Sequence, residues 1–302
     1  MSTAFLFSGQ GSQYSGMGKD LVEAYPKLSE IYERASHVVG FDLMKMCFVG
    51  TNEELSQTRI SQPTIMATSL VAYEAAKTKG LYATAVAGHS LGEYAAMVAS
   101  GILSFEDGFK LIKARADLMQ KAAESNPGAM CAIIGKSPEE VEEICQSLPQ
   151  YAAPVNYNSP VQTVIAGTDE GIDAAVEAFS AVGAKAIRLK VSAGFHSRLM
   201  QPAADEFLKV LKTFHFNRPN CQFMSNLYGD VLTDFSNMPE ILSRHIVSPV
   251  LFSKELVNLA ELGYDTFIEC GPGKVLTGLV RKTLKDVKAR NIEDTASLEA
   301  AV

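Results

Sequence analysis

The stretch that most constrains the fold of this chain is Gly88-His89-Ser90-Leu91-Gly92. It follows an apolar run from Ala83 to Ala87 and precedes a helix-like run from Glu93 to Ser100. Glycines two positions before and two after a serine permit a tight strand-to-helix turn that projects the hydroxyl from the edge of a sheet. The same five-residue pattern also occurs in ordinary loops, but the flanking strand and helix favour a nucleophile elbow, with Ser90 as the nucleophile.

Composition limits the class of protein. The chain has 302 residues, 47% of them hydrophobic, which is enough for a large core and about two domains. Its 27 Lys and Arg against 34 Asp and Glu give a net charge of −7, and the absence of a basic run argues against a nucleic-acid partner. Five scattered cysteines without a CxxC pair predict neither a disulfide framework nor a metal site, and indicate a cytoplasmic protein. No basic leader or bilayer-length apolar stretch is present, so we expect neither export nor membrane insertion.

Strands and helices alternate over residues 1–126, as in a parallel sheet flanked by helices. A long helix is expected from Ser104, with a capping box formed by Ser104 and Asp107, to about Ser125. The breaker Asn126-Pro127-Gly128 then predicts a domain boundary.

Residues 127–193 predict a different unit, because short elements follow one another in the order βαββαβ, which is the ferredoxin-like arrangement. After residue 193 the alternation of helices and strands resumes. We therefore expect an α/β protein whose larger domain, residues 1–126 and 194–302, is interrupted by a smaller one.

A serine nucleophile needs a base, and histidine is the usual one. His196 lies in a short loop, Ser192 to Ser197, where the chain returns to the larger domain. It follows Ser90 in the chain, which is the order of serine and histidine in hydrolases with a nucleophile elbow. His89 is adjacent to Ser90 and is expected to point away from its hydroxyl, whereas His245 remains a rival base. The other two histidines fit surface or packed positions: His37 and His215.

No Asp or Glu between Ser90 and His196 stands out as the third member of a triad. Main-chain carbonyl groups are an alternative, since they accept the Nδ1 proton of an imidazole and fix its tautomer. Such a dyad is less strongly activated than a triad.

Arg115 falls inside the apolar stripe of the helix that begins after Ser104. A buried guanidinium needs a partner, so it forms either a structural ion pair or a clamp for a substrate carboxylate. The loop Gly9-Gln10-Gly11-Ser12-Gln13 follows the first strand and is expected at the same sheet edge as the elbow. It lacks the ending of a phosphate-binding P-loop, and it is either a simple turn or a site of close backbone approach.

Five features together resemble the malonyl-CoA:acyl carrier protein transacylases, in order and spacing, from residue 3 to about 285. They are the loop after the first strand, the elbow at Ser90, Arg115, the loop with His196, and Gly271-Pro272-Gly273-Lys274-Val275-Leu276. The resemblance implies a large α/β-hydrolase-like domain with a parallel sheet and an inserted ferredoxin-like subdomain. It also implies a ping-pong reaction in which malonyl moves from coenzyme A to the enzyme, and then to the phosphopantetheine thiol of acyl carrier protein. Neither a cofactor nor a metal ion is implied.

The resemblance also implies roles for individual residues. Ser90 is the nucleophile, His196 the base, and Arg115 the group that binds the malonyl carboxylate. Main-chain N–H groups of Gln10 and Leu91 form the oxyanion hole. The main-chain carbonyl of His245 orients the catalytic histidine, and Phe195 resembles the pattern that favours malonyl over branched acyl units.

The chain departs from the family pattern at three positions, where many relatives have Pro, Trp and Gln: Ser8, Phe252 and His245. The first two are interpreted as packing variation. The third leaves a main-chain role intact but adds an imidazole beside the site, with a titration of its own.

Three other functions are alternatives: a free-standing acyltransferase of a polyketide synthase, a thioester hydrolase, and a carrier-binding subunit without activity. Arg115 counts against the hydrolase, and Ser90 with His196 against the inactive subunit. A basic cluster near the end of the chain is either a docking patch for an acidic carrier protein or a solvated face: Lys274, Arg281, Lys282, Lys285, Lys288 and Arg290.

Overall fold

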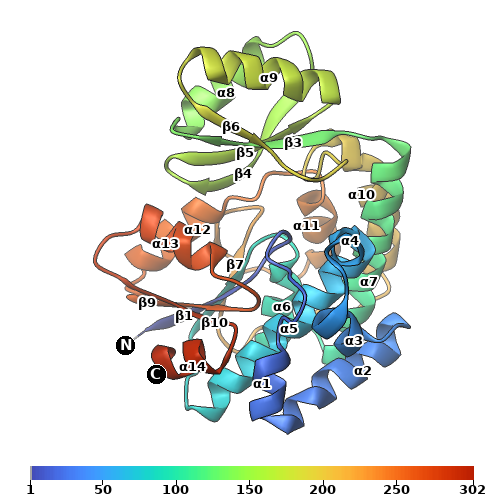
Figure 1. Cartoon of the computed structure of the whole chain (residues 1–302), viewed down its shortest axis with the longest axis vertical. Coiled ribbons are helices and arrows are strands. Elements are labelled where there is room, and N and C mark those ends of the chain that lie inside the picture. Colours follow the sequence, from blue (N-terminus) through green and yellow to red (C-terminus); the bar gives the residue numbers. More distant parts are fainter. Residues whose placement is uncertain (1) are drawn as a thin grey trace.

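A computed structural model describes residues 2–302 and contains two sheets (Figure 1). The larger sheet has the strand order β10-β9-β1-β2-β7-β8, and all its neighbours pair in parallel except β7 and β8. Its strands are β1 (Thr3–Phe7), β2 (Ala85–Gly88), β7 (Gln222–Ser225), β8 (Asp230–Val231), β9 (Thr266–Cys270) and β10 (Lys288–Ile292).

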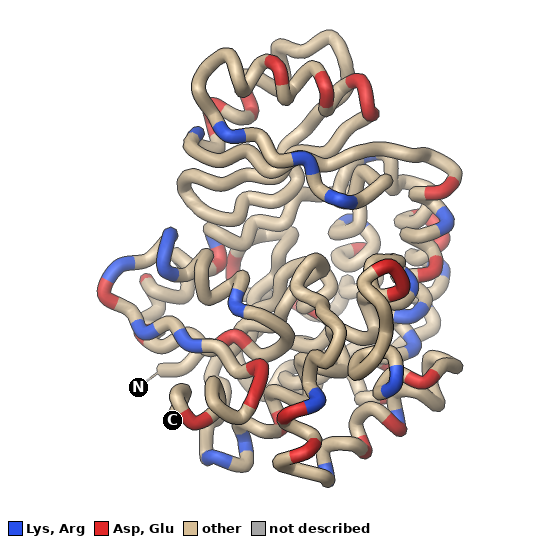
Figure 2. Tube along the Cα trace, in the orientation of Figure 1, with Lys and Arg blue, Asp and Glu red and all other residues tan. Residues whose placement is uncertain are grey.

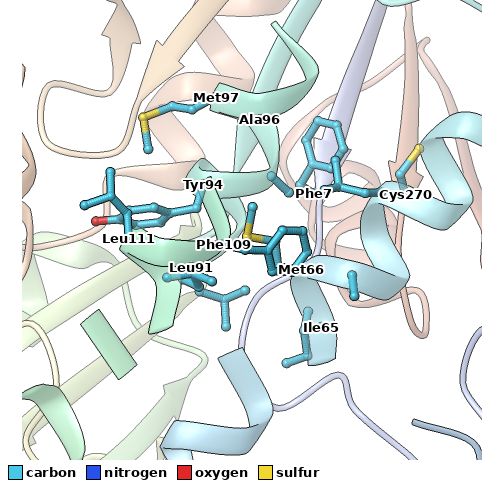
Figure 3. Packing of buried hydrophobic residues seen from close by; sticks show 14 of the residues in the cluster. Phe7, Ile65, Met66, Leu91, Tyr94, Ala96, Met97, Phe109, Leu111 and Cys270 are labelled. Carbon is cyan, nitrogen blue, oxygen red and sulfur yellow. The ribbon is translucent and has the colours of Figure 1, made fainter. Parts of the chain in front are cut away.

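Side chains of β1 alternate between two apolar cores, one on each face of the large sheet. Phe5 and Phe7 belong to the larger core, whereas Ala4 and Leu6 belong to the core beneath the helices α12 (Phe252–Glu261) and α13 (Val275–Thr283). Figure 3 shows part of the larger core, in which Phe7 lies near Met66 and Phe109 of two long helices. Sandwiching the sheet in this way buries the strands on both faces, as expected for a parallel sheet.

The helices associated with the large sheet are α1 (Lys19–Ala24), α2 (Ser29–Val39), α3 (Leu43–Val49), α4 (Asn52–Ser56), α5 (Thr58–Thr78), α6 (Gly92–Ala99), α7 (Phe105–Ser125), α10 (Gln201–Leu211), α11 (Met238–His245), α12 (Phe252–Glu261), α13 (Val275–Thr283) and α14 (Thr295–Ala301). Two short 3₁₀ turns precede α2 and α10, at Pro26–Leu28 and Arg198–Met200.

The small sheet is antiparallel with the order β4-β5-β3-β6, and two helices, α8 and α9, cover its outer face (Figure 1). Its elements follow the chain order β3 (Ala129–Ile134), α8 (Pro138–Ser147), β4 (Ala152–Ser159), β5 (Gln162–Gly167), α9 (Asp169–Ala181) and β6 (Lys185–Arg188). The other face of the small sheet, with Met130 and Ala132, packs against the large core. The structure therefore confirms the α/β class and the ferredoxin-like insertion.

Main-chain hydrogen bonds fasten the small sheet to the rest of the molecule. Tyr157 N–H donates to the Val250 carbonyl and Val250 N–H donates to the Val155 carbonyl, each at 2.9 Å. This short parallel bridge joins β4 to the segment before α12 and brings the small sheet close to the carboxyl edge of the large one.

The expected capping box needs correction. The Ser104 side chain accepts a hydrogen bond from Asp107 N–H at 3.1 Å, but the Asp107 carboxylate accepts one from Lys110 instead, so the capping box is only half formed. No strand was predicted over residues 288–292, where the structure has β10. It is an edge strand, and only one neighbour, β9, is needed to hold it.

No helix within residues 2–302 combines the length and the apolar character needed to cross a membrane.

Candidate active site

Ser90 occupies the turn between β2 and α6, and its backbone has a φ of 55°, in the left-handed region. A Cβ atom on Gly88 would lie 2.0 Å from the carbonyl carbon of Gly92, and one on Gly92 would lie 2.1 Å from the carbonyl oxygen of Phe7. Both positions therefore require glycine, because the strand, the turn and the helix approach one another too closely for any side chain. The turn has the strained geometry of a nucleophile elbow.

His196 lies in the loop after β6, and its ring contacts the Ser90 hydroxyl. The Ser90 hydroxyl lies 2.7 Å from His196 Nε2, and His196 Nδ1 lies 2.9 Å from the main-chain oxygen of His245. A carbonyl oxygen only accepts hydrogen bonds, so Nδ1 carries the proton and Nε2 is left to accept the proton of the serine hydroxyl. This is the tautomer that a general base requires.

Burial keeps the His196 imidazole neutral. The side chain is almost fully buried, and desolvation holds the pKa of His196 well below its ordinary value, with a further lowering from the nearby His245 and Arg115. A neutral imidazole at neutral pH is ready to accept a proton from Ser90.

Arg115, on α7, is 1% exposed and lies directly beside Ser90. Its Nη1 donates to Gln62 Oε1 at 2.7 Å and its Nη2 donates to Ser90 Oγ at 3.1 Å, while its Nε has no acceptor within residues 2–302. No acidic side chain of the described chain forms an ion pair with it, so the structural ion pair considered from the sequence is not formed. Nε and Nη2 share the edge of a guanidinium that binds a carboxylate in bidentate fashion.

Two main-chain amides beside Ser90 lack acceptors. Within the described residues, neither Leu91 N–H nor Gln10 N–H donates a hydrogen bond, whereas Ser90 N–H donates to Asn226 Oδ1 at 2.7 Å. The loop after β1 packs against the elbow, because a Cβ atom on Gly9 would lie 2.8 Å from the His89 carbonyl oxygen. Unpaired amides on two adjacent loops at one sheet edge are the arrangement that an oxyanion hole needs.

The remaining histidines near the site have other partners. The His89 ring turns away from the nucleophile, with Nε2 2.8 Å from Asn158 Oδ1 of β4. His245 is buried, and its Nδ1 lies 2.9 Å from Glu93 Oε2, at ion-pair distance. His245 therefore reaches His196 through its carbonyl while its own ring faces a carboxylate.

Phe195 precedes His196 and is buried in the large core, with 7% of its surface exposed. No group of three or more His, Cys, Asp or Glu residues within residues 2–302 is arranged to hold a metal ion.

Three polar residues of the site were not predicted from the sequence: Gln62, Asn158 and Asn226. Gln62 holds Arg115, Asn158 holds His89, and Asn226 holds Ser90. A signal existed for Gln62, because it is a long polar side chain in a helix that is otherwise buried over most of its length. The two asparagines lie at or just after the ends of strands, where asparagine is common for local reasons, so the sequence offered no comparable signal.

Comparison with known proteins identifies the family of this chain. Residues 4–299 match the family model described as "Acyl transferase domain". The chain is 39% identical to the malonyl CoA-acyl carrier protein transacylase of Bacillus subtilis, over 99% of this chain and 96% of the relative, and 37% identical to that of Escherichia coli K12, over 99% and 98%.

Solved structures give the same result. The malonyl CoA-acyl carrier protein transacylase of Clostridium perfringens superposes with a TM-score of 0.95 at 39% identity, covering 99% of this chain and 96% of that one. A malonyl-transacylase in complex with a type II polyketide synthase acyl-carrier protein also gives 0.95, at 37% identity, with coverages of 100% and 99%. The chain belongs to the acyl transferase family.

Proposed function

We propose that this protein transfers the malonyl group of malonyl-CoA to the phosphopantetheine thiol of an acyl carrier protein, through a malonyl ester of Ser90, and so supplies fatty acid chain elongation. The observation that carries the proposal is the buried Arg115 guanidinium, which has no acidic partner among residues 2–302 and lies 3.1 Å from the Ser90 hydroxyl. A cation at that place fits an acyl group with a free carboxylate. The names of the relatives support the same substrate and acceptor.

The reaction has two half-reactions that use the same groups. Ser90 Oγ attacks the thioester carbonyl while His196 Nε2 takes its proton, and the Leu91 and Gln10 amides stabilise the oxyanion. The intermediate expels coenzyme A, whose sulfur receives the proton from His196. The carrier thiol then gives its proton to His196 and attacks the serine ester, and the proton returns to Ser90 Oγ. These steps use only side chains and main-chain amides, so we propose that no cofactor or metal ion takes part.

The proposal includes the domain boundaries and the location of the enzyme. The catalytic domain comprises residues 1–126 and 194–302, with residues 127–193 as the ferredoxin-like subdomain, and the enzyme acts in the cytoplasm.

Lys and Arg gather along α13, the turn after it and β10 (Figure 2), and this basic cluster is a docking patch for an acidic carrier. Supply of a polyketide synthase is a second candidate pathway, because one solved relative is bound to such a carrier.

The transfer is tested with malonyl-CoA and carrier protein in two forms. Holo-carrier bears the phosphopantetheine thiol and is expected to gain one malonyl group by mass, with stoichiometric release of coenzyme A. Apo-carrier lacks the thiol and is expected to gain nothing. Release of coenzyme A and free malonate at equal rates with both forms would identify a hydrolase and contradict the proposal.

The pH dependence of acylation follows from the pKa of His196. Protonation as the pH falls removes the base, and because the pKa is depressed, we expect the acid limb of kcat/KM below about pH 6.5, the ordinary value for histidine. In His245→Gln the limb is expected to move upward, because the lowering effect of the His245 ring on the pKa of His196 is lost while the main-chain carbonyl remains. The matched control is His215→Gln, at an exposed position. Identical profiles for all three proteins would show that the His245 ring has no influence on the base.

Phe195 is expected to disfavour acyl groups with an α-methyl branch, since a bulky ring before His196 narrows the space for it. One methyl group is worth about 1 to 3 kcal/mol, so the parent should prefer malonyl-CoA over methylmalonyl-CoA by roughly 10-fold or more. In Phe195→Ala we expect the ratio of the two kcat/KM values to approach unity. Comparable turnover of both substrates by the parent would contradict this assignment.

A further inference from the structure

Asn226 is fully buried and immediately follows β7, the strand that pairs with β2. Its Oδ1 accepts a hydrogen bond from Ser90 N–H at 2.7 Å, and its Nδ2 donates one to the Gly88 carbonyl at 2.6 Å. A single side-chain amide thus bonds both the nucleophile and the last residue of the strand that precedes it. No other side chain of the described chain contacts the main chain of the elbow in this way.

This double contact lies where the backbone needs support. The φ of 55° at Ser90 is in a region that residues with a Cβ atom rarely adopt, and such a conformation persists only when its surroundings hold it. The direction of the Cα–Cβ bond, and with it the position of Oγ opposite His196 Nε2, depends on that conformation.

The orientation of the Asn226 amide is itself fixed. Nδ2 also donates to Glu255 Oε1 at 2.7 Å, and burial raises the pKa of Glu255 well above its ordinary value. A flipped amide would turn its NH₂ group toward Ser90 N–H and its oxygen toward the Gly88 carbonyl. Both contacts would then be repulsive, so only one orientation satisfies the buried groups.

The same residue connects the nucleophile with the base. Asn226 main-chain N–H donates to Glu93 Oε1 at 2.7 Å, and Glu93 Oε2 lies 2.9 Å from His245 Nδ1. The His245 carbonyl in turn accepts the Nδ1 proton of His196. One buried chain of contacts therefore runs from the elbow to the residue that orients the base.

We infer that Asn226 is a positioning residue of this active site, whose side-chain amide holds Ser90 in the strained turn so that its hydroxyl meets His196. The inference rests on the proposed function, in which Ser90 carries the acyl group. It also accounts for the oxyanion hole, since Asn226 occupies the Ser90 N–H and leaves the next amide, that of Leu91, free for the substrate.

The test compares three variants with the parent in single-turnover acylation by malonyl-CoA and in steady-state transfer. Asn226→Leu has a similar shape but lacks both polar atoms, and we expect kcat and the acylation rate to fall about 100-fold with KM within about threefold, the effect of a nucleophile displaced by about 1 Å. Asn226→Asp keeps an acceptor for Ser90 N–H and is expected to lose only about 10-fold. Asn258→Leu is the matched control, because Asn258 on α12 also donates to a glycine carbonyl, that of Gly229, but away from the site.

The outcomes separate the inference from the proposed function. A parent protein that forms no Ser90 adduct overturns both. If the parent is acylated and a folded Asn226→Leu protein is acylated at a rate within threefold of the parent rate, the inference alone is overturned. Should Asn226→Leu not fold, as judged by thermal unfolding and circular dichroism, Asn226→Asp decides. A lower kcat at unchanged KM supports positioning, and parent-like kcat overturns it.

Discussion

Replacing Ser90 by alanine is expected to lower malonyl transfer by at least about 10⁴-fold, the scale on which serine enzymes lose activity without their nucleophile. The substitution removes Oγ, to which His196 and Arg115 are both hydrogen-bonded, and which carries the acyl group in the proposed reaction. The elbow itself should persist, because the Ser90 main-chain N–H still bonds to Asn226 in the variant.

The measurement is the initial rate of malonyl transfer to holo-carrier. A suitable control is Ser56→Ala, at an exposed position on α4. We expect the control to retain parent activity and both variants to unfold at temperatures close to that of the parent. Retention of more than about 1% of parent activity by a folded Ser90→Ala protein would mean that another group carries the malonyl.

Replacing Arg115 by alanine is expected to change which acyl group the enzyme accepts. Losing a buried charged hydrogen-bond partner costs about 2 to 5 kcal/mol, so kcat/KM for malonyl-CoA should fall by a factor of roughly 30 to 5 × 10³. Acetyl-CoA has no carboxylate for Arg115 to bind, so its kcat/KM should change far less. Equal losses for the two substrates would show that Arg115 supports the site only as a structural element.

Two refinements sharpen this test. Arg115→Lys keeps the charge but not the planar pair of donors, and we expect it to fall between the parent and Arg115→Ala for malonyl-CoA. An arginine-held carboxylate also leaves less room for an attacking water molecule, so the ratio of hydrolysis to transfer should rise in Arg115→Ala. An unchanged ratio would rule out this part of the account.

The sequence predicted the parts of the site that depend on local geometry. Gly88 and Gly92 are required by contacts within one strand, turn and helix, and their spacing around Ser90 is visible in five residues. Arg115 stood out for a similar reason, because a charged residue in an apolar helical stripe breaks a periodic pattern. The ferredoxin-like insertion was predicted from the change of element order near residue 127.

The parts that were missed depend on the tertiary fold. Asn226 and Ser90 are 136 positions apart, and Gln62 and Arg115 are 53 apart, so nothing local relates the members of either pair. The polar strand β10 likewise becomes recognisable only when β9 is there to pair with it. Side chains that hold other side chains are specified by packing between distant elements, and a single sequence does not display that packing.

The most direct test of the central claim is the intact mass of the protein after brief exposure to malonyl-CoA, beside acetyl-CoA and beside Ser90→Ala. We predict one malonyl adduct on the parent, little or no acetyl adduct, and no adduct on Ser90→Ala. A malonyl adduct that persists on Ser90→Ala, or a parent that releases coenzyme A and malonate without ever carrying an adduct, would contradict the malonyl-serine intermediate.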